Sequence, residues 1–86
     1  MSRKYVVRIV VPARDYRRIA SIVDELEERS QPFLRKRTPH FENRSDLDSL
    51  DIVFILDLNP KEKKELTLKL SKALRKSLGF FLIFPL

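Results

Sequence analysis

Apolar residues alternate with polar or smaller ones in two segments of the chain, a pattern typical of half-buried β-strands. The first segment covers residues 4–11, is rich in β-branched residues and is closed by Pro12. The second covers residues 50–58. Each segment therefore predicts a strand with one face in the core. The predicted core-facing positions are Tyr5, Val7, Ile9, Val11, Leu50, Ile52, Phe54, Leu56 and Leu58.

Two other segments have the apolar spacing of amphipathic helices. The first covers residues 14–29 and is ended by Ser30-Gln31-Pro32. Its apolar positions are Tyr16, Ile19, Ile22, Val23 and Leu26.

The second helix carries clear start and stop signals. Asn59 is a suitable N-cap, Pro60 suits the first helical position, and Glu62 has the spacing of a capping box. Gly79 is expected as the residue that follows the end of the helix. The predicted apolar stripe consists of Leu66, Leu70, Ala73, Leu74 and Ser77.

Two more strands complete the prediction. Residues 33–42 are expected to form an edge strand, because Pro39 cannot donate a ladder hydrogen bond. Residues 43–49 are polar and predict a loop, and residues 80–84 are apolar and predict a last strand. The order strand, helix, strand, strand, helix, strand predicts an α+β, ferredoxin-like split βαββαβ fold, an antiparallel sheet with both helices on one face.

The second face of this sheet is expected to be apolar, although a sheet covered on one side should be polar on the other. Val6, Val10, Val53 and Ile55 fall on it, together with either Phe81 and Ile83 or Phe80 and Leu82. Such a patch typically marks an interaction surface. The alternative is that the C-terminal run folds over this face within the monomer. The candidate partner-interface residues are Val6, Val10, Val53, Ile55, Leu68, Phe80, Phe81, Leu82, Ile83 and Phe84, of which Leu68 points into solvent from the second helix.

Length and composition narrow the class of protein. The 86 residues predict a single domain, 1–86, and no apolar run approaches the roughly 20 residues of a membrane span. With no cysteine and no secretory segment, we expect a cytoplasmic protein that does not act at a membrane. Charged residues make up 35% of the chain while Gln, Asn and Met are scarce, which favours a thermophilic source.

The net charge of +6 and two basic clusters point to an anionic partner. The clusters are Arg14, Arg17 and Arg18 at the start of the first helix, and Arg35, Lys36 and Arg37 after it. Arginine suits phosphate through its planar fork, so these six residues are candidate contacts to tRNA or DNA. The alternative for both clusters is a solvated charged surface.

Candidates for catalysis and metal binding are few. His40 is the only histidine, and no placed acid or nucleophile supports it. Asp46, Asp48 and Asp51 lack the Gly and distal Glu of a calcium loop, and the single glycine excludes a glycine-rich phosphate loop. We therefore expect no enzyme activity, metal or cofactor. A small enzyme with His40 as its base remains the alternative.

Several segments together resemble the small dimerising subunit of the KEOPS complex. They are the run Tyr5-Val6-Val7-Arg8-Ile9-Val10-Val11-Pro12, the basic strand Leu34–Thr38, residues 50–58 and the leucine-striped second helix. The resemblance implies a non-catalytic subunit that dimerises, or pairs with a paralogue, through its sheet. It also implies docking on the catalytic subunit that makes threonylcarbamoyl-adenosine in tRNA, and help in holding that tRNA.

The sequence as a whole thus predicts a basic accessory subunit. It would associate through the second sheet face and offer a positive surface to a tRNA-modifying or other nucleic-acid-handling complex. The alternative is a small archaeal or viral DNA- or RNA-binding protein that acts without a protein partner.

Overall fold

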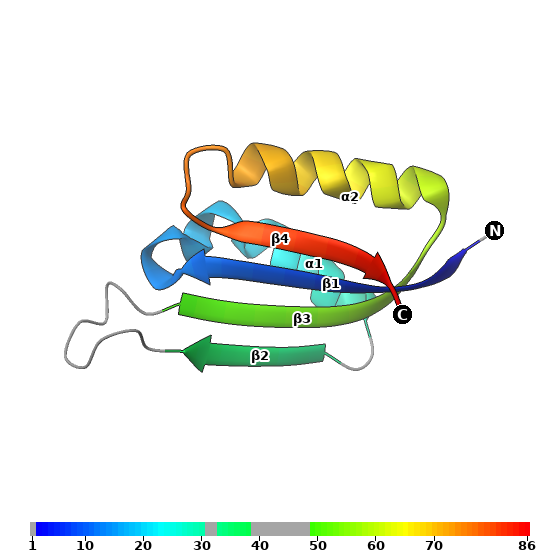
Figure 1. Cartoon of the computed structure of the whole chain (residues 1–86), viewed down its shortest axis with the longest axis horizontal. Helices are drawn as coiled ribbons and strands as arrows, with labels where there is room; N and C mark the ends of the chain where they lie inside the picture. Colours follow the sequence, from blue (N-terminus) through cyan, green and yellow to red (C-terminus); the bar gives the residue numbers. More distant parts are fainter. Residues whose placement is uncertain (1, 31–32, 39–48) are drawn as a thin grey trace.

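The computed structural model describes residues 2–30 and 49–86 with their side chains, and the backbone of residues 33–38 (Figure 1). The helices are a short 3₁₀ helix, η1 (Ala13–Arg18), and two α-helices, α1 (Ala20–Arg29) and α2 (Pro60–Ala73). The strands are β1 (Arg3–Pro12), β2 (Phe33–Thr38), β3 (Ser49–Leu58) and β4 (Phe80–Pro85).

The four strands form one antiparallel sheet in the order β2-β3-β1-β4. The central pair β1–β3 is the longest, running from Arg3 opposite Leu58 to Pro12 opposite Ser49. Both α-helices pack on one face of the sheet, so the fold is the ferredoxin-like βαββαβ arrangement that the sequence predicts. The predicted edge strand is present as Phe33–Thr38, and residues 39–48 lie outside the described part of the chain.

The core lies between the helices and the inner face of the sheet. Val7, Ile9 and Val11 of β1 are fully buried, as their alternation predicts, and Ile52 and Phe54 of β3 pack beside them. Each helix adds its apolar stripe to the same cluster. The members from the helices and their cap residues are Ile19, Val23, Leu26, Leu66, Leu70 and Leu74. The core is therefore confined to the helix side of the sheet.

The first helical segment is not one α-helix, as the sequence predicted, but two helices joined at Ile19. Residues 13–18 form η1, and Ile19 leaves helical geometry with φ −117° and ψ 0° before α1 begins. Its N–H donates to the Tyr16 carbonyl oxygen at 2.9 Å, the three-residue closure of a 3₁₀ turn. The three-residue repeat of this turn keeps both Tyr16 and Ile19 on the core side, and α1 then continues the apolar stripe with Ile22 and Val23.

The start of α2 is confirmed, whereas its predicted end is wrong. Asn59 accepts from the Glu62 N–H, and the Glu62 side chain accepts from the Asn59 N–H, which completes the capping box. The helix ends at Ala73, well before Gly79. A Cβ on Gly79 would lie 2.6 Å from Val11 Cγ1 and 2.8 Å from the Val10 carbonyl oxygen. Gly79 is therefore required by the close approach of the chain to β1, and does not cap the helix.

No helix in the described ranges combines the length and the apolar character needed to cross a membrane.

Candidate interaction face

The outer face of the sheet is the side turned away from the helices. Its positions alternate with the buried ones along each strand, so they follow from the register of β1, β3 and β4. The outer face consists of Lys4, Val6, Arg8, Val10, Asp51, Val53, Ile55, Asp57, Phe80, Leu82 and Phe84. Seven of these residues are apolar, and they lie among the charged residues Lys4, Arg8, Asp51 and Asp57, as the sequence predicts for a largely apolar second face.

Strand β4 supplies the largest exposed side chains of this face. Phe80, Leu82 and Phe84 are 52%, 46% and 43% exposed. Phe81 and Ile83 instead lie on the inner side, half-buried against the core. The structure thus selects Phe80 and Leu82 from the two alternatives, and it removes Phe81 and Ile83 from the candidate interface.

The C-terminal run does not cover the outer face. It lies beside β1 as an edge strand, with Val6 opposite Phe84 and Val10 opposite Phe80 (Figure 1). The side chains of Phe80, Leu82 and Phe84 therefore enlarge the apolar surface. A segment folded over this face would have covered it. The internal-cover alternative left open by the sequence is wrong.

Arg8 and Asp51 form an ion pair within this apolar surface. Arg8 Nε donates to Asp51 Oδ1 at 2.9 Å, and Nη2 donates to Oδ2 at 2.5 Å. The two residues are diagonal neighbours, because Arg8 lies opposite Val53 and Asp51 lies opposite Val10. Hydrogen bonding to Asp51, and its negative charge, raise the pKa of Arg8 above its ordinary value. The two charges thus neutralise each other in place.

Leu68 belongs to a different surface from the outer face. It is 54% exposed on α2 and borders a shallow hollow lined also by Tyr5, Lys63 and Lys64. The Tyr5 ring there makes cation–π contacts with two side chains, with Arg3 Cζ at 5.7 Å and Lys63 Nζ at 5.1 Å from the ring centroid. The structure therefore does not bring Leu68 together with the other candidate interface residues.

The first basic cluster is exposed on η1. Arg14, Arg17 and Arg18 all reach solvent, but Arg18 Nε lies 3.6 Å from Asp15 Oδ1. Asp15 is itself held by Ser77, whose Oγ donates to Oδ2 at 2.7 Å. Arg14 and Arg17 form no ion pair with any residue that the structure describes, so they are the stronger phosphate candidates of the three.

The second basic cluster falls on the edge strand β2. In the register, Lys36 lies opposite Asp51, and Arg35 and Arg37 lie opposite Ile52 and Leu50. The side chains of Arg35, Lys36 and Arg37 are outside the described part of the chain, so their role as phosphate contacts stays a prediction.

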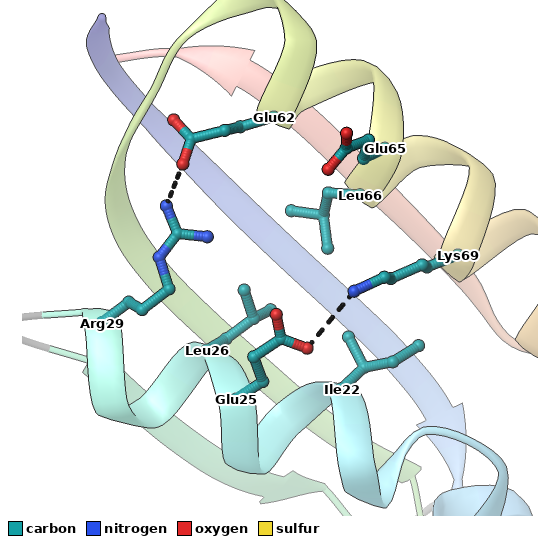
Figure 2. Close-up of a pocket in the computed structure, with 8 residues that line it drawn as sticks. All are labelled: Ile22, Glu25, Leu26, Arg29, Glu62, Glu65, Leu66 and Lys69. Carbon is teal, nitrogen blue, oxygen red and sulfur yellow. Dashed lines mark hydrogen bonds and ion pairs between the residues drawn. The ribbon is translucent and has the colours of Figure 1, made fainter.

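A narrow pocket of about 80 Å³ lies between α1 and α2, on the side of the molecule opposite the outer face (Figure 2). Ion pairs bridge the helices across it, Arg29 Nη2 to Glu62 Oε2 at 2.7 Å and Lys69 Nζ to Glu25 Oε2 at 3.4 Å. The hydrogen bond from the Asn59 N–H, reinforced by Arg29, lowers the pKa of Glu62. The two ion pairs link α1 to α2. Sequence analysis missed them because they depend on how the two helices are placed relative to each other.

The described residues include no group of three or more His, Cys, Asp or Glu side chains that could hold a metal ion. The acidic loop prediction included Asp51, which is paired with Arg8, while Asp46, Asp48 and His40 lie outside the described residues. The expectation of no enzyme activity is not tested by this arrangement.

Comparisons with known proteins bear on the fold alone. No protein-family model matches the chain, and no curated protein is significantly similar to it. The uncharacterized protein TM1266 from Thermotoga maritima has a similar structure, with a TM-score of 0.70 and 23% identity, over 100% of this chain and 99% of that one. A DUF3240 family protein from Shewanella baltica OS155 has a TM-score of 0.61 and 15% identity, over 100% of this chain and 92% of that one. At these identities the chain shares the fold of these two proteins.

Proposed function

We propose that this chain is a non-catalytic accessory subunit that associates with a protein partner through the outer face of its sheet. The apolar outer face carries the proposal. An antiparallel sheet with helices on one side normally has polar residues on the other. Here the apolar residues Val6, Val53 and Ile55 are partly exposed, and three more exposed apolar side chains of β4 lie on the same face. A contiguous apolar patch on a small protein typically marks a binding surface.

The charges of the outer face support burial against a partner. An unpaired charge inside an interface costs several kcal/mol, of the order of 3–5, because its hydration is lost without compensation. Arg8 and Asp51 already satisfy each other through two hydrogen bonds. A partner covering the centre of this face therefore needs no charged group of its own, and a mostly apolar partner surface fits it.

The same proposal gives the chain a positive surface for nucleic acid. Arg14 and Arg17 on η1 are exposed, and the chain has a net charge of +6. Side chains of this kind bind phosphates with release of counterions, which makes the affinity fall steeply with salt. Sequence resemblance suggests a KEOPS-like complex with tRNA as the first complex to test, in which the partner would be a second copy, a paralogue or the catalytic subunit.

A matched pair of lysine substitutions tests the association. Val53→Lys places a charge in the middle of the outer face, whereas Leu68→Lys places the same charge on an exposed leucine of α2. We expect binding of the partner to be weakened by Val53→Lys and unchanged by Leu68→Lys. Equal behaviour of the two variants would remove the outer face from the proposal.

Binding to tRNA and to duplex DNA at low salt tests the second half of the proposal. We expect weak binding by the isolated chain, with a strong salt dependence, and tighter binding by the complex. Micromolar or tighter binding by the isolated chain would favour the stand-alone nucleic-acid-binding protein, for which Arg14 and Arg17 are the supporting observation. Undetectable binding at low salt would remove nucleic acid from the account.

A further inference from the structure

Strand β4 is an edge strand without the usual protection against pairing. It has β1 on one side and no strand on the other among the described residues (Figure 1). Natural edge strands are normally protected by charged side chains, bulges or prolines, because their free N–H and C=O groups otherwise pair with another chain. All side chains of β4, Phe80-Phe81-Leu82-Ile83-Phe84-Pro85, are uncharged, and its only proline is the last residue.

One hydrogen bond identifies the backbone groups that face the free edge. The Leu86 N–H donates to the Lys4 carbonyl oxygen at 3.0 Å, so Leu86 and Lys4 of β1 are a hydrogen-bonded pair of the antiparallel ladder. Such pairs alternate along an antiparallel ladder. Even-numbered residues of β4 therefore bond to β1, and the N–H and C=O of Phe81 and Ile83 point to the free edge. Pro85, which has no N–H, falls in the same odd-numbered set, where an edge strand tolerates proline.

We propose that a second copy of this chain pairs its β4 antiparallel to this β4, with Leu82 opposite Leu82 of the copy. In this register Phe81 lies opposite Ile83 at two symmetric places, and each pair exchanges two backbone hydrogen bonds. All N–H groups of Phe81 and Ile83 are then used. On the outer face, Phe80 lies opposite Phe84 and Leu82 opposite Leu82, which are apolar cross-strand pairs.

The neighbouring symmetric registers bond less well. A shift that puts Ile83 opposite Ile83 brings Phe81 opposite Pro85, which has no donor. A shift that puts Phe81 opposite Phe81 brings Ile83 opposite Gly79, whose N–H already donates to Ser77 Oγ at 3.0 Å. The register centred on Leu82 is therefore favoured by the backbone groups that β4 has available.

The self-complementarity of β4 selects a second copy as the occupant. Two copies with a net charge of +6 each repel one another over most of their surface. The β4 edge is a place where they meet without charges, and a two-fold axis through Leu82 makes the strand its own complement. The product is a continuous eight-stranded sheet, in which the two outer faces join into one surface. The inference goes beyond the proposed function, since it concerns an edge of the sheet and would hold if the outer face bound no further partner.

The absence of cysteine from the chain permits a direct test of the register. Leu82 would lie in a non-hydrogen-bonded pair with itself, where Cα atoms are about 4.5 Å apart, within the range of a disulfide. We expect Leu82→Cys to form a disulfide-linked dimer under mild oxidation, with Leu68→Cys as an equally exposed control that stays monomeric on a non-reducing gel. Cross-linking of Leu82→Cys no faster than of Leu68→Cys would overturn the proposal.

Two further measurements separate edge pairing from other arrangements. The wild-type protein is expected to sediment as a dimer with a dissociation constant of about 1 μM or less. A protein that is still monomeric at about 100 μM would overturn the inference, and would leave the proposal for the outer face unaffected. Val53→Cys reports on face-to-face packing of two sheets, because Val53 lies away from the β4 edge. Rapid cross-linking of Val53→Cys with none of Leu82→Cys would overturn edge pairing and support association through the outer face.

Discussion

Arg8 on β1 and Asp51 on β3 are joined by two hydrogen bonds across a diagonal of the sheet, among the apolar residues of the outer face. The pair brings two opposite charges together, so this part of the outer face carries no net charge. This part of the surface is suited to burial, because each charge of the Arg8–Asp51 pair is compensated by the other.

Breaking this ion pair on one side is expected to weaken association more than removing both charges. Asp51→Ala leaves the Arg8 guanidinium unpaired in the buried interface, and truncation of one member of such a pair costs about 2 kcal/mol or more, roughly a 30-fold loss of affinity. The double variant Arg8→Leu, Asp51→Leu retains association because neither member of the pair is left without the other. Titration of partner binding by both variants checks this. A double variant weaker than Asp51→Ala would contradict the role given to the pair.

The Glu62 carboxylate is expected to stabilise the fold only while it is ionised. Its pKa is lowered in the folded protein, first by the Asn59 N–H and then by Arg29, so its contribution is present above its ordinary pKa near 4.5 and is lost as the pH falls through the folded value. Urea unfolding of wild type and Glu62→Gln should therefore differ at pH 7 and converge below pH 4.5. A difference that grows in acid would contradict this assignment.

The N-cap of α2 is expected to contribute about 1 kcal/mol to the free energy of unfolding. Asn59→Ala removes the oxygen that accepts from the Glu62 N–H at 2.8 Å, whereas Asn59→Asp keeps an acceptor and serves as the control. The expected result is a lower urea midpoint for the alanine variant with an unchanged m-value. Equal midpoints for the two variants would show that the cap adds nothing.

Gly79→Ala is expected to destabilise the protein by about 1–3 kcal/mol, because the new methyl group meets Val11 and the backbone of Val10. The adjacent Leu78 is 83% exposed, so Leu78→Ala is a matched control expected to change stability by no more than about 0.5 kcal/mol. Thermal unfolding of both variants checks the contrast. A harmless alanine at position 79 would mean that β1 and the approach to β4 can separate at little cost.

The arginines of η1 are expected to contribute to the salt dependence of nucleic-acid binding. Replacing Arg14 and Arg17 by glutamine should lower affinity for every sequence alike, and reduce the slope of log affinity against log salt by about one for each phosphate that is no longer neutralised. The variant Lys61→Gln, Lys72→Gln removes the same charge from α2 and is the control. An equal effect of both double variants would indicate general attraction and no site on η1.

Local patterns predicted most of the fold. The alternation in residues 4–11 and 50–58 identified the buried faces of β1 and β3, and the Asn59, Pro60, Glu62 spacing identified the start of α2. These features depend on neighbours within a few residues, which a sequence displays directly. The ferredoxin-like split βαββαβ fold then followed from the order of the elements.

Features that join distant segments could not be predicted in the same way. The Arg8–Asp51 pair depends on the register of β1 against β3, and the Arg29–Glu62 bridge depends on the distance between two helices. The role of Gly79 depends on how closely the chain passes β1. The sequence therefore suggested a helix C-terminal glycine, whereas the structure requires glycine there because a Cβ would clash with Val11 and Val10. The outward direction of Phe80 and Leu82 likewise depends on the register of β4 against β1.

The most direct test of the outer face is copurification from the protein's own cells, with tagged wild type, Val53→Lys and Leu68→Lys compared after nuclease treatment. The account predicts a stoichiometric protein partner, a polypeptide other than a copy of this chain, with wild type and Leu68→Lys, and its loss with Val53→Lys. Full recovery of the partner by Val53→Lys, or the loss of every protein on nuclease treatment of the wild type, would contradict association through the outer face.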